Sequence, residues 1–491
     1  MPTPLLCETV TGRTMAELIV ARDAVCHANM VEVRLDGVAD ADPVGAVAGR
    51  RFPVVVTCRP VWEGGRFDGS EEERLRLLAG ALGAGAEFVD VEWKAAHSNL
   101  LGLTGGRRVI LSSHDFSGVP SDLFDRVAAM RATSAEVVKV AVMTRRLSDA
   151  LPLLDLPRGG KLVSIGMGAA GIATRVLAAR FGSCWTYAGP AVAPGQMPSK
   201  EMVSTYRFHT LGEGTKVYGV AGKPVMHSLS PVMHNAAFAA REIDAVYVPL
   251  EAADFDDFEQ FAARLDLRGA SVTIPYKLDA LRQAHRVDAD ARAFGAANTL
   301  RHGTIGWEAT NTDAAGFLAP LDAAVGQRGW VTIDGARAAI VGAGGAARAV
   351  AHGLTARGAR VTVHARNPEQ ARAVAESVGG AVGTWPVARG TWDLLVNCTP
   401  LGSMAQPNES PLPGGPFSGR LVYDLVYVPT ATRLLREAEA AGCATIGGLA
   451  MLVAQAERQF EWWTGVAPPA GLMARVAGSA MQLREASGPE A

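Results

Sequence analysis

Short apolar runs rich in β-branched residues recur at a regular spacing through the first part of the chain. Such runs, apolar throughout rather than alternating, are typical of parallel strands buried on both faces. The runs cover residues 5–10, 30–36, 53–59, 88–93, 108–114, 137–143, 161–167 and 184–189. Stretches with helical periodicity lie between most of them, at residues 15–28, 71–82, 123–132 and 172–181. Eight strands alternating with helices predict a (β/α)8 barrel, with an open doubly wound sheet as the alternative.

A second series of strands and helices follows residues 199–215, where a helix end gives way to a glycine-punctuated connector. Its first strand begins at Lys216, and further strands are expected at 245–250, 269–275 and 297–308. A break at 326–329 precedes another set of strands, expected at 338–341, 360–364, 392–397, 421–427 and 444–446. The pattern therefore predicts an α/β architecture throughout, in which the barrel is followed by further sheets covered by helices.

The composition is that of an ordinary globular protein, with 48% hydrophobic and 20% charged residues. Lys and Arg total 47 against 49 Asp and Glu, a balance that argues against nucleic acid or an anionic membrane as the main partner. The six cysteines form no C-x-x-C pair and match neither a zinc site nor a disulfide framework, so reduced thiols and no metal are expected. Because the N-terminus lacks a secretory signal and no long apolar run follows, we expect a cytoplasmic protein.

A lysine interrupts one of the runs that should be buried. Lys139 lies in the middle of the run at 137–143. Burial makes an ammonium costly, so the amine must either be paired or give up its proton more readily than in water. A neutral lysine in an apolar pocket is what Schiff-base formation with a ketone requires. The alternative is a lysine at the strand end that reaches solvent.

Other polar residues end or interrupt the neighbouring runs. His114 closes the run at 108–114, and Glu32 and Arg34 are two positions apart, so both point to one face of their strand. In a barrel these groups would meet at the mouth formed by the carboxyl ends of the strands, together with Arg59, Glu63 and Arg175. Together with Lys139 they would form an imine-forming site for an anionic keto acid. The alternatives are a rim histidine at His114 and a mutual salt bridge between Glu32 and Arg34.

These residues stand in motifs that resemble the type I 3-dehydroquinate dehydratases, over residues 5–200. The motifs are Val31-Glu-Val-Arg, Cys58-Arg-Pro with Glu63-Gly-Gly, Ser113-His-Asp-Phe, Val138-Lys-Val-Ala-Val-Met and Ala193-Pro-Gly-Gln. The resemblance implies that Lys139 forms an imine with the C3 ketone of 3-dehydroquinate and that His114, assisted by Glu63, moves protons. It also implies that the substrate hydroxyls and carboxylate are held by Glu32, Arg34, Arg59, Arg175 and Gln196. Val192 stands where the family would have a serine, which removes a potential hydrogen bond to the substrate.

A glycine-rich turn follows the strand expected at 338–341. Gly342-Ala-Gly-Gly-Ala-Ala is a G-x-G-x-x-A pattern between a strand and a helix, which is typical of dinucleotide binding. The next strand ends at Ala365-Arg366-Asn367, with no carboxylate before Glu369 to bind a ribose 2′-hydroxyl. An arginine suits a 2′-phosphate instead, so NADP(H) is expected rather than NAD(H). The alternative is a solvated Arg366 on the surface.

Candidate catalytic residues also precede this turn. Lys277 lies just beyond an expected strand, and Asp313 lies at the start of an expected helix. Hydride transfer to a ketone needs a proton for the developing alkoxide, which a lysine oriented by an aspartate can supply. Asp313 could instead cap its helix, and Lys277 could begin a helix in solvent. Ser228 and Ser230 could cap a helix or bind a carboxylate.

From residue 216 to 485 the chain strongly resembles the shikimate dehydrogenases. The matching stretches are Gly219-Val-Ala-Gly-Lys-Pro-Val-Met-His-Ser-Leu-Ser-Pro, Asn397-Cys-Thr-Pro-Leu-Gly, Asp424-Leu-Val-Tyr and Gly448-Leu-Ala-Met-Leu-Val-Ala-Gln. The resemblance implies that Lys277 and Asp313 form the catalytic pair. It implies substrate contacts from Ser228, Ser230, Thr273, Asn298, Tyr427 and Gln455. It implies NADP contacts from Gly342, Ala343, Gly344, Gly345, Ala346, Ala365, Arg366, Asn367 and Gly448.

The two resemblances together match the plant-type bifunctional enzymes of the shikimate pathway. They imply a barrel at 1–205, a substrate-binding domain at 216–326 with C-terminal helices at about 448–485, and a Rossmann NADP-binding domain at 330–447. The barrel would dehydrate 3-dehydroquinate, and the second half would reduce 3-dehydroshikimate to shikimate with NADPH. The alternatives are a quinate dehydrogenase in the second half or a non-catalytic metabolite-sensing regulator. The expected partners are these small molecules, not nucleic acid or membrane, and no oligomeric state is predicted.

Overall fold

A computed structural model describes residues 3–190, 193–327, 332–388, 390–415 and 417–487. The chain packs into two compact units. The first comprises Met1–Val217, Lys223–Met226 and Asp244–Leu267, and the second comprises Tyr218–Gly222, His227–Ile243 and Arg268–Ala491. Val192, which departs from the dehydratase pattern, lies outside the described residues.

Eight parallel strands form the core of the first unit. They are β1 (Leu5–Val10), β2 (Met30–Arg34), β3 (Val54–Thr57), β4 (Phe88–Glu92), β5 (Val109–Asp115), β6 (Val137–Met143), β7 (Lys161–Met167) and β8 (Trp185–Ala188). Each strand pairs with its neighbour in the chain as far as β7, and β1 also pairs in parallel with β8. The backbone N–H of Cys184 donates to the carbonyl of Leu162, which links the two ends of the sheet. This nearly closed order confirms the predicted barrel over the open sheet.

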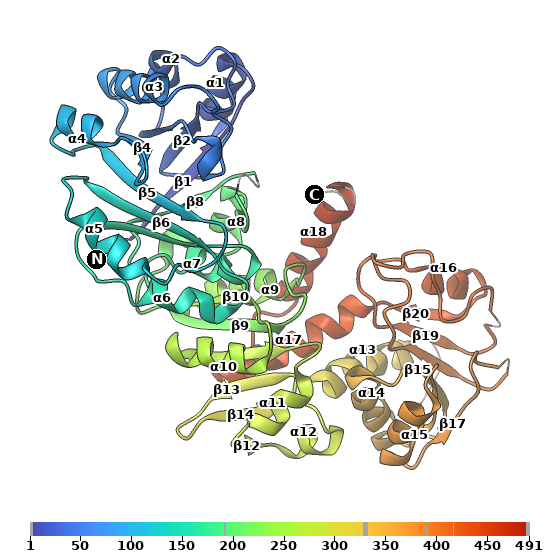
Figure 1. The fold of residues 1–491 in the computed structure, drawn as a ribbon. Helices are drawn as coiled ribbons and strands as arrows, with labels where there is room; N and C mark the ends of the chain where they lie inside the picture. Colours follow the sequence, from blue (N-terminus) through green and yellow to red (C-terminus); the bar gives the residue numbers. More distant parts are fainter. Residues whose placement is uncertain (1–2, 191–192, 328–331, 389, 416, 488–491) are drawn as a thin grey trace. The chain divides into compact units, whose positions relative to one another are not determined.

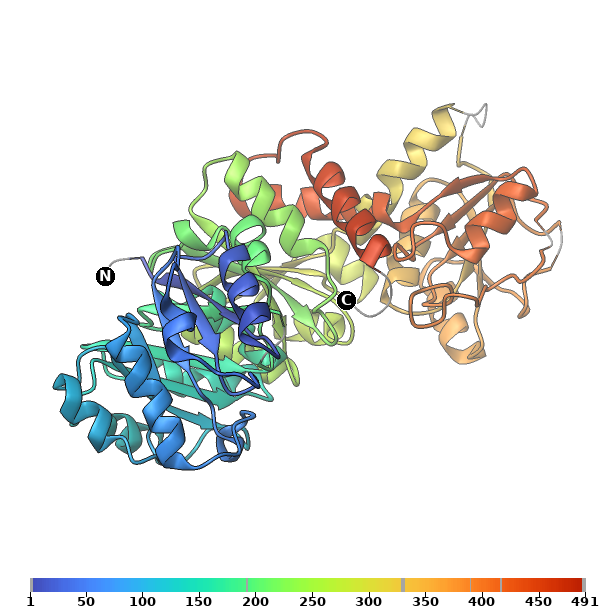
Figure 2. The same ribbon diagram turned by 90° about the horizontal axis from the view of Figure 1, so that it is seen from above.

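Helices follow most of the barrel strands. They are α1 (Met15–Ala24), α2 (Pro43–Val47), α3 (Glu71–Gly83), α4 (Ser98–Thr104), α5 (Leu123–Arg131), α6 (Leu151–Leu154), α7 (Ile172–Val176) and α8 (Ser199–Ser204). Helices α1–α5 lie along the outside of the strands (Figures 1 and 2). The start of α3 shows why these segments are helical, because the Ser70 hydroxyl accepts from the backbone N–H of Glu73 and three glutamates occupy the first turn. A short 3₁₀ turn, η1 (Val61–Glu63), follows β3 and brings Glu63 to the barrel mouth.

A mixed sheet of six strands continues the chain. Its strands are β9 (Lys216–Gly222), β10 (Ala245–Glu251), β11 (Leu267–Val272), β12 (Arg286–Val287), β13 (Thr299–His302) and β14 (Trp307–Thr310), in the order β10-β9-β11-β13-β14-β12. The accompanying helices are α9 (Ser230–Ala240), α10 (Phe255–Arg264), α11 (Lys277–Gln283), α12 (Ala289–Phe294) and α13 (Asp313–Gln327). The single strand predicted at 297–308 is wrong, because a turn closed by the N–H of Gly303 on the carbonyl of Gly306 makes a hairpin of β13 and β14.

The last sheet is parallel throughout. Its strands are β15 (Arg337–Val341), β16 (Arg360–His364), β17 (Ala381–Val382), β18 (Leu394–Asn397), β19 (Leu421–Asp424) and β20 (Ala444–Ile446). The order β17-β16-β15-β18-β19-β20 places the first strand beside the point where the winding reverses, as in a Rossmann sheet. Helices α14 (Gly345–Ala356), α15 (Pro368–Ser377) and α16 (Arg433–Ala440) connect these strands, and α17 (Gly448–Thr464) and α18 (Leu472–Ser487) follow.

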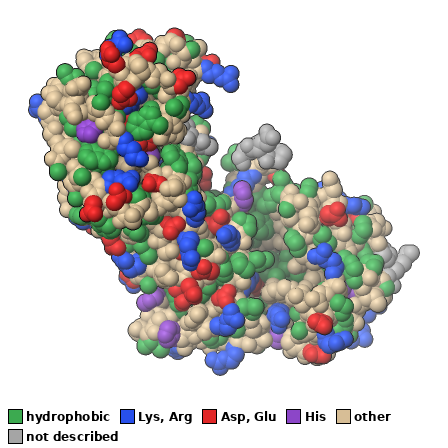
Figure 3. Space-filling model, in the orientation of Figure 1, with side chains coloured by type: hydrophobic (Ala, Val, Ile, Leu, Met, Phe, Trp, Pro, Cys, Tyr) green, Lys and Arg blue, Asp and Glu red, His purple; other side chains and the backbone are tan. Residues whose placement is uncertain are grey.

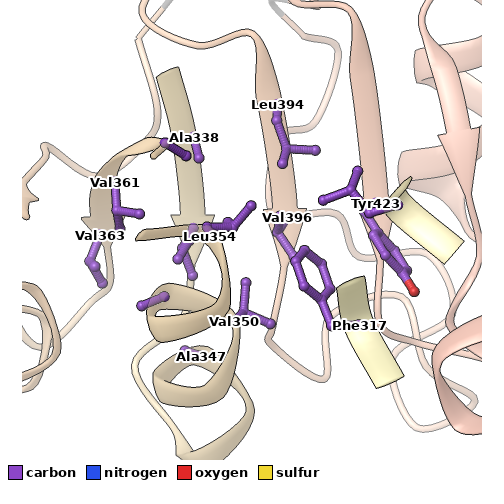
Figure 4. Close-up of a cluster of buried hydrophobic side chains, with 14 of the residues drawn as sticks. Phe317, Ala338, Ala347, Val350, Leu354, Val361, Val363, Leu394, Val396 and Tyr423 are labelled. Carbon is purple, nitrogen blue, oxygen red and sulfur yellow. The ribbon is translucent and has the colours of Figure 1, made fainter. Parts of the chain in front are cut away.

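Apolar side chains from this sheet and its helices form one buried cluster (Figure 4). Val350 and Leu354 of α14 lie against strand residues such as Ile340, and the ring of Phe317 from α13 stacks on Tyr423 with centroids 4.8 Å apart. Because α13 contributes to this core, the helix that begins at Asp313 is held at a set position against the Rossmann sheet.

Acidic and basic side chains are interspersed over the face drawn in Figure 3. Among the described residues, no helix is both long and apolar enough to cross a membrane.

Candidate active sites

A cavity of about 170 Å³ opens at the carboxyl ends of the barrel strands. All eight residues that the sequence assigned to a barrel site line it, namely Glu32, Arg34, Arg59, Glu63, His114, Lys139, Arg175 and Gln196. These residues are far apart in the sequence, and the parallel strands bring them together at the carboxyl end of the barrel. The cavity suits a small polar molecule.

Lys139 is buried on β6, with 4% of its surface exposed, which excludes the solvent-reaching alternative. Its Nζ lies 2.9 Å from Oδ2 of Asp90 and 3.6 Å from Oε1 of Glu32. The ring of Tyr187 on β8 covers the amine, with the centroid 4.1 Å from Nζ. The amine is therefore held at the cavity between two carboxylates and an aromatic face.

Glu32 and Arg34 do not pair with each other as the simpler interpretation expected. Glu32 accepts hydrogen bonds from the hydroxyls of Thr9 and Thr57, at 2.9 and 2.8 Å. Arg34 instead forms a two-point ion pair with Asp36, at 2.7 and 2.8 Å. Burial by itself would lower the pKa of Arg34, but the hydrogen bonds and charge of Asp36 raise it. Both side chains are thus fixed by other partners at the cavity wall.

His114 and Glu63 form a close pair. One carboxylate oxygen of Glu63 accepts from the backbone N–H of His114 at 2.9 Å and lies 3.0 Å from Nδ1 of its ring. Burial, and then the nearby charges of Arg59 and Lys139, hold the pKa of His114 well below its usual value. The imidazole is therefore neutral, and its partner Glu63 orients it.

Burial shifts the pKa of Glu63 in the direction opposite to that of His114. Burial raises the pKa of Glu63 to about 7, and the charge of Arg59 only partly offsets this. A carboxyl group that titrates near neutral pH beside a neutral imidazole is suited to proton transfer.

Arg175 on α7 is buried without a carboxylate partner among the residues described. Within the described ranges, its guanidinium donates to the backbone carbonyls of Tyr187 and Pro194, at 3.2 and 3.3 Å, and its Nε makes no hydrogen bond. Burial lowers the pKa of Arg175 to about 10. A buried cation lacking a counter-ion at a cavity wall is suited to binding an anionic group.

Behind the cavity wall lie acidic residues that the sequence analysis missed. Asp90 and Glu92 lie two apart in β4 and are fully buried. Burial would raise the pKa of Asp90, but the charges of Arg59 and Lys139 outweigh it and hold that pKa well below its usual range. The signal was present, since two acids in an otherwise apolar strand must have buried partners.

A second polar site lies at the start of α13. Nζ of Lys277 lies 2.5 Å from Oδ2 of Asp313. The other carboxylate oxygen of Asp313 accepts from Nδ2 of Asn298 at 2.7 Å. The side-chain Oδ1 of Asn298 in turn accepts from the backbone N–H of Thr312 at 2.9 Å. Asp313 is therefore held on both sides, and it orients the lysine rather than merely capping its helix.

The other residues assigned to substrate binding in this half are placed as follows. The Ser228 hydroxyl accepts from the backbone N–H of Ser230 at 3.1 Å, at the beginning of α9. Gln455 lies on α17 against α13, where its Nε2 donates to the carbonyl of Leu452 at 2.9 Å. Burial raises the pKa of Tyr427. The backbone N–H of Thr273 donates to the carbonyl of Ala221 at 2.9 Å, which joins the segment after β11 to β9.

The glycine-rich turn joins β15 to α14. Gly342 has φ +108°, a conformation that favours glycine, and a Cβ there would lie 3.1 Å from the backbone of Cys398, where space is tight. Ala343 lies in the turn, Gly344 is the N-terminal cap of α14, and Gly345 and Ala346 are the first residues of that helix. A Cβ at Gly345 would lie 3.6 Å from Cδ of Lys277. The turn therefore borders the lysine directly.

The end of β16 carries the remaining residues assigned to the cofactor. Ala365 is partly buried, Arg366 is exposed, and Asn367 caps α15 by accepting from the backbone N–H groups of Glu369 and Gln370. Gly448 begins α17, where a Cβ would lie 2.2 Å from the carbonyl oxygen of Leu425. Asn367 and Gly448 thus have clear structural roles at these positions. Within the described ranges, no group of three or more His, Cys, Asp or Glu side chains could hold a metal ion.

Four protein-family descriptions match segments of the chain. Type I 3-dehydroquinase matches residues 6–213, and the shikimate dehydrogenase substrate binding domain matches 220–300. The shikimate 5′-dehydrogenase C-terminal domain matches 448–477, and NADP oxidoreductase, coenzyme F420-dependent, matches 337–401.

Individual proteins match over longer stretches. The chloroplastic bifunctional 3-dehydroquinate dehydratase/shikimate dehydrogenase of Arabidopsis thaliana is 33% identical, covering 95% of this chain and 83% of the relative. The shikimate dehydrogenase (NADP(+)) of Methanocella arvoryzae is 42% identical, covering 54% of this chain and 99% of the relative. A crystal structure of shikimate dehydrogenase in complex with NADP+ superimposes with a TM-score of 0.51 at 31% identity, covering 55% of this chain and 97% of its own.

Proposed function

The chain belongs to the bifunctional 3-dehydroquinate dehydratase/shikimate dehydrogenase family, and from this premise we propose which side chains carry each reaction. It is a 3-dehydroquinate dehydratase and an NADP-dependent shikimate dehydrogenase. The alternatives of a quinate dehydrogenase and a non-catalytic regulator are not favoured, because the relatives are named for both enzymatic activities.

In the dehydratase, Lys139 is the nucleophile. Its neutral amine adds to the substrate ketone, and loss of one water leaves a carbon–nitrogen double bond in place of the carbonyl. Protonated, this imine acidifies the neighbouring C–H bond. The neutral imidazole of His114 takes that proton and returns it to the hydroxyl that leaves as water from the next carbon. Hydrolysis of the imine consumes one water and frees Lys139, so the net change is the loss of one water.

The remaining cavity residues bind the substrate. Arg175 takes the carboxylate, which is supported by its burial without a counter-ion among the residues that the structure describes. Glu63 orients His114 through the contact at Nδ1. The substrate hydroxyls are bound by Glu32, Arg34, Arg59 and Gln196.

In the dehydrogenase, Lys277 and Asp313 act on the ketone oxygen. NADPH, when bound, supplies the hydride. Lys277 donates a proton to the alkoxide that develops on the substrate, and Asp313 holds the ammonium in place. Asn298 fixes Asp313 from the other side. Substrate is bound by Ser228, Ser230, Thr273, Asn298, Tyr427 and Gln455.

The residues present fit NADP. The turn from Gly342 to Ala346 offers a backbone without crowding side chains at the N-terminus of α14, where a pyrophosphate binds favourably. Arg366, exposed at the end of β16, suits the 2′-phosphate. Ala365, Asn367 and Gly448 complete the site through their backbones, since the Asn367 side chain is engaged as a helix cap.

We retain the three-domain division, with a barrel at 1–205, a substrate-binding domain at 216–326 plus 448–485, and a nucleotide-binding domain at 330–447. It is supported by the separate sheets and by the family matches at 6–213, 220–300 and 337–401. We also propose a cytoplasmic location, supported by six cysteines that are all free. Fractionation of the source cells with an antibody to the chain tests this.

The observation that carries the dehydratase assignment is the buried Lys139 amine at the cavity wall. Borohydride added with 3-dehydroquinate should leave a stable adduct on Lys139, which peptide mass spectrometry locates. The adduct should vanish in Lys139→Met. It should persist in Lys161→Met, a control on the next strand, whose half-exposed amine pairs with Glu136. An adduct on another lysine would contradict the assignment.

A further inference from the structure

Charged side chains of alternating sign continue inward from the dehydratase cavity. Asp90 binds Lys139 through one carboxylate oxygen and Nη2 of Arg59 through the other, each at 2.9 Å. Nη1 of Arg59 contacts one oxygen of Glu92 at 2.6 Å. The other oxygen of Glu92 lies 2.5 Å from Nη1 of Arg74. The result is one unbroken line of ion pairs from Lys139 to Arg74.

The last two members of this line lie outside the cavity. Lys139 and Arg59 line it, whereas Glu92 and Arg74 do not. Arg74 is on the outer helix α3, yet its side chain is 1% exposed. It is anchored there by two bonds to Glu71, both of 2.8 Å, and by donation to the carbonyl of Cys58.

The guanidinium of Arg59 is shared between two buried carboxylates. Its Nη2 forms an ion pair with Asp90, and its Nη1 donates to Glu92 and to the hydroxyl oxygen of Ser112. Burial raises the pKa of Glu92, and the charges of Arg59 and Arg74 oppose that rise. Without Arg74, the ionised Glu92 would depend on Arg59 alone and would draw it away from Asp90. The relative strength of the contacts that Arg59 makes with Asp90 and with Glu92 therefore depends on Arg74.

We propose that Glu92 and Arg74 are positioning residues of the dehydratase: they set how strongly Arg59 binds Asp90 and hence how strongly Asp90 binds the Nζ of Lys139. The inference rests on the proposed role of Lys139 as the imine-forming amine. Neither residue touches substrate, and both act through Arg59.

The sign of the effect follows from charge. While Arg59 keeps Glu92 ionised, loss of the cation in Arg74→Met makes Glu92 compete harder for Arg59, which weakens the contact of Arg59 with Asp90 and strengthens the contact of Asp90 with Lys139. The stronger contact with the Asp90 carboxylate opposes attack by the Lys139 amine, and imine formation moves to higher pH. Removing the anion in Glu92→Gln frees Arg59 for Asp90, and imine formation moves to lower pH.

Other charged and titratable groups also face or act on the Lys139 amine and stay in place in these variants. They are Glu32 of β2, Asp90 of β4, Arg59 after β3, His114 of β5, Cys7 of β1 and Tyr187 of β8. Because these groups are the same in every variant, a difference between two pH profiles reports the substituted residue.

The test measures the rate at which cyanoborohydride traps the 3-dehydroquinate adduct, as a function of pH, on the full-length chain. The proteins are wild type, Arg74→Met, Glu92→Gln and the double variant. Arg22→Met is the matched control, because Arg22 is an equally buried barrel arginine held by Asp23 and the carbonyl of Ala46. Dehydrogenase activity on the same chain and the melting temperature report folding.

We expect the midpoints of Arg74→Met and Glu92→Gln to move in opposite directions by about half a pH unit or more, and the double variant to lie between them. On the rising limb this is about a threefold change in trapping rate in each direction. Arg22→Met should lower the melting temperature without moving the profile. Should Arg74→Met fail to fold, the isosteric Glu92→Gln alone carries the predicted sign.

Profiles of both variants that coincide with wild type, with only the melting temperature lowered, would overturn the inference and leave the pair purely structural. Failure of the proposed function gives a different result, because Lys139→Met would then still form the trapped adduct whatever happens at Arg74.

Discussion

Substituting Glu63 by glutamine keeps an oxygen that can accept from His114 and removes the carboxyl group that titrates near neutral pH. Oε1 of Glu63 accepts from the backbone N–H of His114 and faces Nδ1 of the ring. While Glu63 is ionised, Nδ1 must carry the proton, which leaves Nε2 free as the base. Protonated Glu63 can donate to Nδ1 instead, and the imidazole then carries its proton on Nε2 and cannot act as the base. A glutamine oxygen in the same place keeps the active tautomer at every pH.

The size of the effect follows from the pKa of Glu63. Burial raises that pKa from 4.5 to about 7, equivalent to about 3 kcal/mol against ionisation. A group with this pKa is about 90% ionised at pH 8 and about 3% ionised at pH 5.5. The ratio of the Glu63→Gln rate to the wild-type rate should therefore rise about 30-fold as the pH falls from 8 to 5.5.

The assay is the initial rate of 3-dehydroshikimate formation, followed by the ultraviolet absorbance of its conjugated ring at saturating substrate. Taking the ratio of variant to wild type cancels the titration of every group that the two proteins share. A ratio that stays constant from pH 5.5 to 8 would refute the assignment of Glu63 as the group that titrates near neutral pH. Dehydrogenase turnover of the same preparations serves as the folding control.

Three further substitutions have defined outcomes. Arg366→Ala should raise KM for NADPH at least tenfold more than KM for NADH, while Arg372→Ala on the exposed face of α15 changes neither; equal effects on both cofactors would make Arg366 a bystander. Asp313→Asn should lower dehydrogenase kcat by about 100-fold or more and leave dehydratase kcat unchanged, as stopped-time assays of each step would report. Asp257→Ala should lower unfolding stability by about 2–3 kcal/mol, because its buried carboxylate accepts from the backbone N–H groups of Leu147 and Ser148 at 3.0 and 2.8 Å. Burial would raise the pKa of Asp257, but the backbone N–H of Ala253 and then those of Ser148 and Leu147 lower it, so the contribution is present at neutral pH and fades as the pH falls through the carboxylate range. Calorimetry at pH 7 beside exposed Asp256→Ala checks this, and equal melting temperatures would contradict it.

Local pattern predicts the barrel well because each strand is buried on both faces. The run at 137–143 matches β6 at both ends, and the burial of Lys139 follows from its place in that run. The order of the strands was also predictable, since consecutive parallel strands joined by helices pair with their neighbours. Very short strands were missed, because the two residues of β12 or of β17 carry no period.

The site was predicted as a set of rim residues, and its supporting layer was not. Arg74 sits on a helix with a glutamate three positions before it, which is the usual pattern of a solvated helix face. Only the fold shows that Glu92, on a strand, reaches the same guanidinium. Similarly, the sequence assigned Asn298 to the substrate but could not show its hydrogen bond to Asp313, because the two residues are joined through the hairpin of β13 and β14.

The most direct test of the account is to mix two full-length variants, each of which lacks one of the two activities. Given 3-dehydroquinate and NADPH, Lys139→Ala should consume neither, and Lys277→Ala should accumulate 3-dehydroshikimate without oxidising NADPH. Mixing the two variants should restore shikimate formation, because each supplies the step that the other lacks. Shikimate produced by either variant alone, or none from the mixture of folded proteins, would contradict the assignment of one lysine to each reaction.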